Sequence, residues 1–217
     1  EHLVNAFLSV RDKNPNLVLV IAGEGPEKKY IEEIIKKNSA MNLKIIETNR
    51  LLLKGFTPED MNYIFENLPI SEIKTLLGHT SDEAYQKEAL KQKQGYSSYN
   101  RSFVLFLLID KETNKIIGRC GLHNWNKEHF RAEIGYSMED EFFKNKGLMS
   151  EAVEAIIRFG FNELKLNRIE ALVGVNNVPS LNIIAKNHFT KEGVLRKHYL
   201  LEDTYVDSVF FSLLAER

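Results

Sequence analysis

From residue 41 onward, apolar positions form short runs typical of strands and longer stretches at helical spacing. The runs predict strands, in chain order, over residues 43–45, 51–53, 103–109, 115–124, 132–138, 169–175 and 205–214. The helical spacing predicts a long helix over residues 146–164 and shorter helices over 61–68, 71–77, 81–94 and 180–187. Tight turns between the central strands indicate an antiparallel meander, and the later strand–helix order indicates helices on the sheet faces. We therefore expect an α/β fold with a mixed sheet.

The residues around position 57 have the chemistry of a helix start. Thr57 suits an N-cap and Pro58 suits the first helical position. Glu59 and Asp60 add negative charge to the first turn, where the helix dipole favours it. We expect a helix to begin here, directly after the second strand.

A polar stretch over residues 38–42 divides the chain. Before it, residues 1–40 contain an apolar run over 17–22, typical of a strand buried on both faces, and a lysine-rich helical pattern after a turn. We expect a strand–helix appendage over residues 1–40 and one larger domain over residues 41–217.

Composition and charge exclude several classes of protein. The 217 residues carry 29 Lys and Arg against 30 Asp and Glu, a formal net charge of −1. That balance argues against a nucleic-acid coat, and no apolar run approaches the roughly 18 residues of a membrane span. The single cysteine, Cys120, forms no internal disulfide, which fits the reducing cytoplasm. His123 and His129 lack companion metal ligands. We expect a cytoplasmic protein without metal, nucleic-acid partner or membrane partner, and homodimer formation stays open.

A glycine-containing segment with two lysines joins the third central strand to the long helix; it consists of Lys144, Asn145, Lys146, Gly147, Leu148, Met149 and Ser150. The glycine lets the backbone approach a ligand closely. The first amides of the helix have no partners within it, and together with the helix dipole they favour an anion such as a pyrophosphate. The alternative is a plain helix start with solvated lysines.

Residues 144–149 resemble the acetyl-CoA pyrophosphate loop of the GNAT N-acetyltransferase superfamily. That loop runs Gln or Arg, two residues, Gly, one residue, then Gly or Ala. Gly147 fits the first glycine and Lys144 keeps the positive charge of arginine, whereas Met149 departs from the small residue.

Further motifs resemble, in the expected order, the RimJ/RimL type of GNAT enzymes, which acetylate ribosomal-protein N-termini. They include Thr57-Pro58-Glu59-Asp60, Arg131-Ala132-Glu133-Ile134-Gly135-Tyr136, Asn177-Val178-Pro179-Ser180 and Asn187-His188-Phe189-Thr190. Several spaced motifs in order are more specific than any one of them. The match covers residues 41–217, while residues 1–40 resemble a fragment of a GT-B glycosyltransferase.

The GNAT resemblance implies a mixed, mostly antiparallel sheet, flanked by helices and splayed around acetyl-CoA. It implies that strand amides near Met138 hold the pantetheine and thioester, that Asn177 contacts the pantetheine, and that residues 144–150 hold the pyrophosphate. It also implies that the Ser180 hydroxyl protonates the leaving thiolate. From the residues alone, Ser180 suits a helix N-cap and Asn177 a turn, so both interpretations stay open.

Other side chains are candidates for the chemistry or for substrate binding. Glu133 lies mid-strand and either faces water or points into a cleft, where burial suits a carboxylate to take a proton from an ammonium. His123 is a satisfied polar residue or, alternatively, part of the acceptor site or a base. Trp125 is a second candidate for the acceptor site. The resemblance places Tyr199 where the serine-acetylating relative carries a candidate base, and Ile184 where many GNAT enzymes carry a tyrosine general acid. We therefore keep Tyr199 as a catalytic candidate.

The resemblance predicts acetyl transfer from acetyl-CoA to a primary amine, most naturally a protein N-terminal α-amine. An α-amine with a pKa near 8 is roughly one-tenth neutral at pH 7, so it needs less help from a base than lysine does. One alternative acceptor is an amino sugar or another small amine. A second alternative is an acetyl-CoA-binding module without activity.

Overall fold

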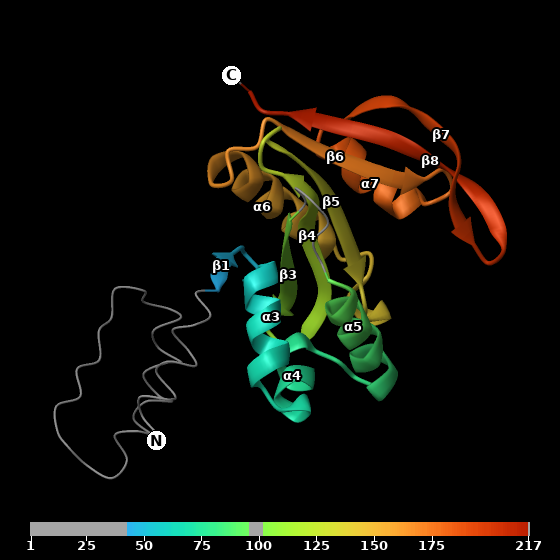
Figure 1. Cartoon of the computed structure of the whole chain (residues 1–217). Helices are drawn as coiled ribbons and strands as arrows, with labels where there is room; N and C mark the ends of the chain where they lie inside the picture. The colour runs from blue at the N-terminus through green and yellow to red at the C-terminus, as the bar shows by residue number, and fades with distance from the viewer. Residues whose placement is uncertain (1–42, 96–101, 217) are drawn as a thin grey trace, which may run out of the picture.

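A computed structural model of the chain describes residues 43–95 and 102–216. In these residues one eight-stranded sheet has the order β1-β2-β3-β4-β5-β6-β8-β7 (Figure 1). Its strands are β1 (Lys44–Glu47), β2 (Leu51–Phe56), β3 (Ser102–Asp110), β4 (Ile116–Asn126), β5 (Arg131–Met138), β6 (Arg168–Gly174), β7 (Thr190–Leu201) and β8 (Thr204–Leu214). Among the described strands, only β5 and β6 pair in parallel. This confirms the predicted mixed, mostly antiparallel sheet.

Helices cover both faces of the sheet. They are α3 (Pro58–Asn67), α4 (Ile70–Leu77), α5 (Asp82–Gln94), α6 (Leu148–Asn162) and α7 (Val178–Lys186), with a short 3₁₀ helix, η1, over Glu141–Phe143. Phe106 and Leu108 pack with α6 in one core, whereas Leu107 packs with α3 and α4 in a second core on the opposite face. This alternation follows from the two-residue period of a strand.

The predicted helix start at residue 57 is confirmed. Thr57 is the N-cap of α3, and Pro58 opens the helix. The Thr57 backbone N–H donates to Asp60 Oδ2 at 2.8 Å, and the Asp60 N–H donates to Thr57 Oγ1 at 3.3 Å. This reciprocal pair is a capping box with aspartate as the acidic partner.

One strand was not predicted from the sequence. β7 pairs with β8 alone and lies at the edge of the sheet, and nearly all its residues are exposed. An exposed edge strand has no buried face to impose an apolar alternation. Its pairing is also interrupted, because residues 196–198 lie opposite Asp207 alone, with Lys197 at a φ of 51°.

The parallel pair of strands separates soon after it begins. β5 and β6 pair only from Arg131 with Arg168 to Glu133 with Glu170. Beyond that point β5 continues to Met138 and β6 to Gly174 without pairing to each other. The sheet is therefore splayed between β5 and β6, as the GNAT resemblance implied.

Two expectations concern the rest of the chain. The appendage predicted over residues 1–40, with its strand over 17–22, lies outside the described residues. None of the helices described is long and apolar enough to cross a membrane.

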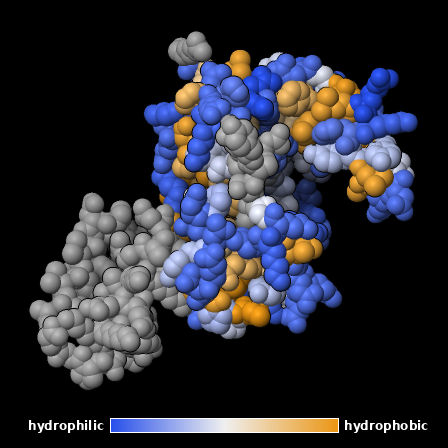
Figure 2. All heavy atoms as spheres, viewed as in Figure 1, coloured by the Kyte–Doolittle hydropathy of each residue, from blue (hydrophilic) through white to orange (hydrophobic). Residues whose placement is uncertain are grey.

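The surface in Figure 2 is largely hydrophilic, with apolar side chains gathered around the β7–β8 end. They include Val194, Leu195, Tyr199, Leu200, Leu201 and Tyr205.

Candidate active site

A cavity of about 270 Å³ opens where β5 and β6 separate; we call it the inter-strand cavity. Glu133 and Tyr136 of β5, the second half of β6, Asn177 and Ser180 at the start of α7, and Tyr199 of β7 line it. Segments far apart in the chain thus bring five of the predicted site residues together: His123, Glu133, Asn177, Ser180 and Tyr199.

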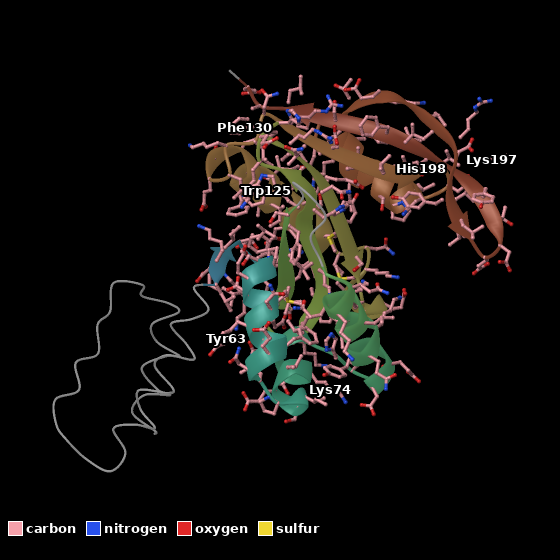
Figure 3. The ribbon with its side chains drawn as sticks, viewed as in Figure 1. Tyr63, Lys74, Trp125, Phe130, Lys197 and His198 are labelled. Carbon is pink, nitrogen blue, oxygen red and sulfur yellow. The ribbon has the colours of Figure 1, made fainter. Side chains whose placement is uncertain are left out.

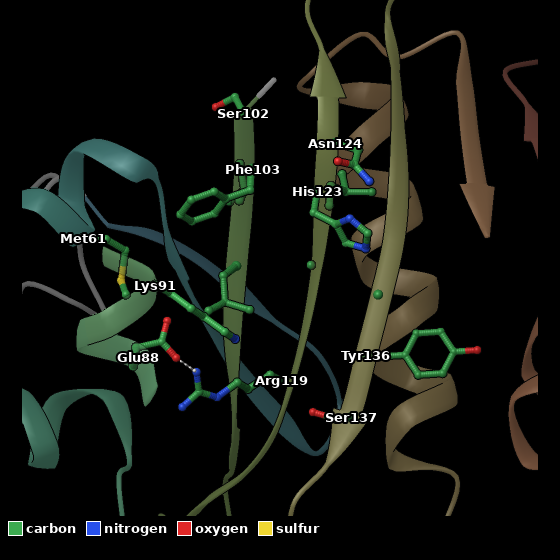
Figure 4. A pocket seen from close by; sticks show the side chains of 15 residues that line it. Met61, Glu88, Lys91, Ser102, Phe103, Arg119, His123, Asn124, Tyr136 and Ser137 are labelled. Carbon is green, nitrogen blue, oxygen red and sulfur yellow. Dashed lines mark hydrogen bonds and ion pairs between the residues drawn. The ribbon is translucent and has the colours of Figure 1, made fainter. Parts of the chain in front are cut away.

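A second cavity, of about 480 Å³, lies between α3, α5 and strands β3 to β5; we call it the helix-side cavity (Figure 4). Its size is in the range of small-ligand sites. Apolar side chains, including Met61 and Phe103, form part of its wall. Its charged wall contains Arg119, which donates to Glu88 at 3.2 Å and to Glu139 at 2.8 Å.

The two cavities share three lining residues, His123, Gly135 and Tyr136. His123 is on β4 and Gly135 is on β5, so the shared wall lies at the centre of the sheet. A molecule in the inter-strand cavity and a molecule in the helix-side cavity would both contact this wall. The arrangement therefore suits a reaction between two bound substrates.

Glu133 lines the inter-strand cavity rather than lying on a solvated face of the sheet. It is 14% exposed. Its Oε2 accepts a hydrogen bond from Asn124 Nδ2 at 3.0 Å, and its Oε1 lies 3.7 Å from His123 Nε2. A carboxylate, an imidazole and an amide thus lie close together at the junction of the cavities.

Two tyrosines supply phenolic hydroxyls to this region. Burial raises the pKa of Tyr136 to about 12, and its hydroxyl donates to the Ser180 carbonyl at 3.4 Å. Burial, and to a lesser degree the negative charge of Glu133, raises the pKa of Tyr199. Both phenols therefore keep their protons at neutral pH and act as hydrogen-bond donors.

The start of α7 differs from one of the sequence interpretations. Asn177, not Ser180, is the N-cap, and its Oδ1 accepts a hydrogen bond from the Ser180 backbone N–H at 3.2 Å. The interpretation of Ser180 as a cap is therefore wrong. Because only the backbone of Ser180 takes part in the cap, its hydroxyl is not committed to the helix end.

Gly147 is the N-cap of α6 and has a φ of 76°. A Cβ at this position would meet nothing closer than Arg50 Nη2, at 3.6 Å. Left-handed backbone conformation, rather than crowding within the protein, therefore explains the glycine. No side chain caps this helix, so its first amides remain available for an anion.

The side chains around Gly147 point in different directions. Lys144 pairs with Glu141, and the Lys146 ammonium lies 3.4 Å from the centroid of the Phe142 ring. Met149 is buried, 8% exposed, in the core beneath α6. The side chain that departs from the family pattern thus packs away from the loop.

Sequence reasoning did not assign a role to Arg50, which holds this loop. Its Nε donates to Glu151 Oε2 at 2.8 Å, and its Nη1 donates to the Lys146 carbonyl at 2.9 Å. Burial opposes ionisation of Glu151, but hydrogen bonds from Thr48 and Arg50 outweigh it and lower the pKa of that carboxyl. Arg50 lies about a hundred residues from its partners, so no local spacing could reveal the contact.

Open amides at a helix start, with lysines nearby, fit the diphosphate of a coenzyme A thioester. The separated edge of β5 fits the amide-containing arm of such a molecule, because the described part of the chain pairs none of residues 134–138 with β6. The segment that joins β5 to α6 follows this strand edge. Met138 is the last residue of β5, and Ser150 lies in the first turn of α6. The residues present therefore fit acetyl-CoA.

Trp125 is placed apart from the other candidates. It packs against the core at the end of β4, with Lys127 Nζ 4.9 Å from its ring centroid, and it lines neither cavity. Figure 3 shows it well away from His198 on β7.

Ile184 is fully buried, so it is a core residue. Among the residues described, no group of three or more His, Cys, Asp or Glu is arranged to hold a metal ion.

Comparisons with known proteins agree with this geometry. Residues 50–190 match the acetyltransferase (GNAT) domain family. A Bacillus licheniformis protein named uncharacterized N-acetyltransferase p20 is 33% identical over 79% of this chain and 97% of its own length. The ribosomal protein uS5 alanine N-acetyltransferase of Escherichia coli is 32% identical over 56% of this chain and 59% of its own length.

A solved structure has the same fold. The GNAT-family acetyltransferase from Bacillus anthracis is 26% identical and covers 79% of this chain and 98% of that one, with a TM-score of 0.56. The splayed sheet, the open start of α6 and the sequence matches lead to one conclusion: the chain belongs to the GNAT family and is an N-acetyltransferase.

Proposed function

We propose that the chain transfers the acetyl group of acetyl-CoA to the α-amine of a protein N-terminus, as the ribosomal-protein acetyltransferases do by name. The observation that carries the proposal is the wall shared by the two cavities, at His123, Gly135 and Tyr136. The inter-strand cavity suits the thioester and the helix-side cavity suits the acceptor. Direct transfer requires the two substrates to meet at such a wall.

On the donor side, the first amides of α6 and the residues from Lys144 to Ser150 hold the diphosphate. Gly147 aims these amides through its left-handed conformation, and Arg50 holds the loop by its bonds to Lys146 and Glu151. The strand edge that ends at Met138 holds the arm of the coenzyme. Asn177 acts here through the cap that orients the start of α7.

Three side chains of the inter-strand cavity have roles in the chemistry of this proposal. The Ser180 hydroxyl, free of the helix cap, donates a hydrogen bond to sulfur as negative charge develops there. Tyr199 is a second donor rather than a base, because its raised pKa keeps the phenol protonated. Glu133 places negative charge beside the shared wall, with its Oε1 3.7 Å from His123 Nε2.

The acceptor class follows from the chemistry of the amine and from the named relatives. An α-amine near pKa 8 loses its proton readily at neutral pH, whereas a lysine near 10.4 does not. The uS5 relative is by its name an alanine N-acetyltransferase of a ribosomal protein. An amino sugar or another small amine is the alternative acceptor that the experiment must separate.

The experiment measures release of the coenzyme A thiol with a matched set of acceptors. Peptides with a free Ser or Ala N-terminus are compared with the same peptides carrying a blocked α-amine and a free lysine, and with glucosamine and spermidine. Turnover that requires the free α-amine supports the proposal. Preferred turnover of an amino sugar or polyamine contradicts it, and acetyl-CoA binding without turnover would indicate a binding module.

A further inference from the structure

The imidazole of His123 lies over a residue that leaves room for it. A Cβ on Gly135 would be 2.8 Å from His123 Nε2 and 3.0 Å from Cδ2, closer than Cβ atoms approach such neighbours. The Nε2–Cδ2 edge of the ring therefore rests on the backbone of β5, which only a glycine permits. Gly135 and His123 both line the two cavities.

The same edge of the ring faces a carboxylate. Nε2 lies 3.7 Å from Glu133 Oε1, and Asn124 holds the other carboxylate oxygen at 3.0 Å. Such a separation is common in sites without substrate and shortens in the reacting complex. A carboxylate beside Nε2 favours the tautomer with its proton on that nitrogen, which leaves the lone pair on Nδ1 at the opposite edge of the ring.

The exposure of the two side chains separates their roles. His123 is 46% exposed and lines both cavities, whereas Glu133 is 14% exposed and lines only the inter-strand cavity. Both oxygens of Glu133 face groups of the chain itself, namely Asn124 and His123. The imidazole is therefore the better placed group to exchange a proton with an acceptor and then with water.

Other charged and titratable side chains line the cavities around the ring, and Tyr136 lines both of them. Tyr199 of β7 lines the inter-strand cavity, and Glu88, Lys91 and Arg119 line the helix-side cavity. Arg119 is engaged with Glu88 and Glu139. Among the described residues, Glu133 alone lies within ion-pair distance of His123, at 3.7 Å.

We propose that Nδ1 of His123 takes the proton of the acceptor amine, that Glu133 fixes the tautomer of the ring, and that Gly135 is a positioning residue that seats it. The inference rests on the proposed amine acetylation. The bond that forms joins the acceptor nitrogen to the acetyl carbon, and the bond that breaks joins that carbon to sulfur, which keeps the electron pair. The surplus proton on nitrogen passes to Nδ1 and from there to water.

The test uses the full chain and compares removal of the ring with displacement of the ring. His123→Ala and His123→Gln remove the imidazole, and Gly135→Ala displaces it by a single methyl group. Gly193→Ala is the matched control, because a Cβ at Gly193 meets no heavy atom within 4 Å and Gly193 lines neither cavity. For each variant one measures kcat and KM with a free-N-terminus peptide, the calorimetric affinity for acetyl-CoA, and the melting temperature.

We expect both His123 variants to lose about 100-fold in kcat and added imidazole to restore part of the rate of His123→Ala. Gly135→Ala should lose about tenfold in kcat, because a small misplacement of a catalytic group is costly. Gly193→Ala should stay within about twofold of wild type in kcat and in acetyl-CoA affinity. The His123 and Gly135 variants should still bind acetyl-CoA, because these substitutions leave the diphosphate loop intact.

Several results would overturn this assignment while leaving the proposed function intact. They are an active wild type whose His123 variants keep their kcat, a lost rate that imidazole does not restore, or a Gly135→Ala variant that behaves like Gly193→Ala. A wild-type chain that binds acetyl-CoA but acetylates no amine would overturn the proposed function, and the role of His123 with it.

Discussion

Ser180→Ala tests whether the Ser180 hydroxyl donates a hydrogen bond to the sulfur of the thioester. The structure predicts the effect of this substitution on the free energy of unfolding and on kcat separately. The cap of α7 uses the Ser180 backbone N–H and the Asn177 side chain, so the substitution removes no cap hydrogen bond. Alanine is also at least as good a helix former as serine. We therefore expect the free energy of unfolding to change by less than about 0.5 kcal/mol, as at ordinary surface sites.

The rate should respond differently. A hydroxyl that donates to sulfur as charge develops contributes about 100-fold, so kcat should fall by about that factor. The affinity for acetyl-CoA should change little, because the diphosphate loop is untouched. Ser180→Cys should recover only part of the rate, since a thiol is a weaker donor.

Asn177→Ala is the matched variant, because it removes the cap and leaves the hydroxyl. Loss of an asparagine cap costs about 1 kcal/mol, which lowers the melting temperature of a chain of this size by about 2–4 °C. Thermal melts run beside thiol-release kinetics compare the two. A Ser180→Ala variant that keeps kcat within about threefold of wild type while losing stability would refute the assignment.

Three further predictions concern Gly147 and the contacts that hold its loop, and one concerns the appendage. Gly147→Glu places a strained residue and a negative charge at the open helix start, so calorimetry should show no acetyl-CoA binding by a folded variant; unchanged affinity would remove the diphosphate site from this loop. Arg50→Ala removes the bonds to Glu151 and the Lys146 carbonyl, and acetyl-CoA affinity should fall about tenfold, with circular dichroism unchanged. Because the pKa of Glu151 is lowered, its contribution to stability is complete above the ordinary carboxyl pKa of 4.5 and is lost as the pH falls through the lowered value. In urea unfolding measured below pH 4.5, the Glu151→Gln variant should therefore lose less stability with falling pH than wild type does. A chain that begins at Met41 should fold and bind acetyl-CoA, and an insoluble product would show that the boundary we drew is wrong.

Strong local patterns predicted most of the fold. The capping box at Thr57 and the apolar face of α6 are local signals, and both elements formed where the pattern placed them. β7 could not be predicted in the same way, because it is an exposed edge whose pairing is interrupted at residues 196–198. Its place in the sheet depends on β8, not on its own alternation.

The site could be predicted only in part, for a related reason. Residue types and the family resemblance identified Ser180, Glu133 and Tyr199 as candidates, and all three line one cavity in the structure. The contact of Arg50 with Glu151 joins elements far apart in the chain, and no spacing reports such a contact. Which residue caps α7 was also undetermined, because both Asn and Ser favour that position.

The shared wall of the cavities has a consequence for the order of events in a catalytic cycle. If both substrates contact His123, Gly135 and Tyr136, the acetyl group can pass directly from the thioester to the amine. No side chain of the enzyme then has to carry the acetyl group as a covalent intermediate. The single thiol of the chain could not act as that carrier, because Cys120 is fully buried and burial raises its pKa, which suppresses the nucleophilic thiolate. Turnover would then proceed through a ternary complex with sequential kinetics, and double-reciprocal rate plots would intersect rather than run parallel.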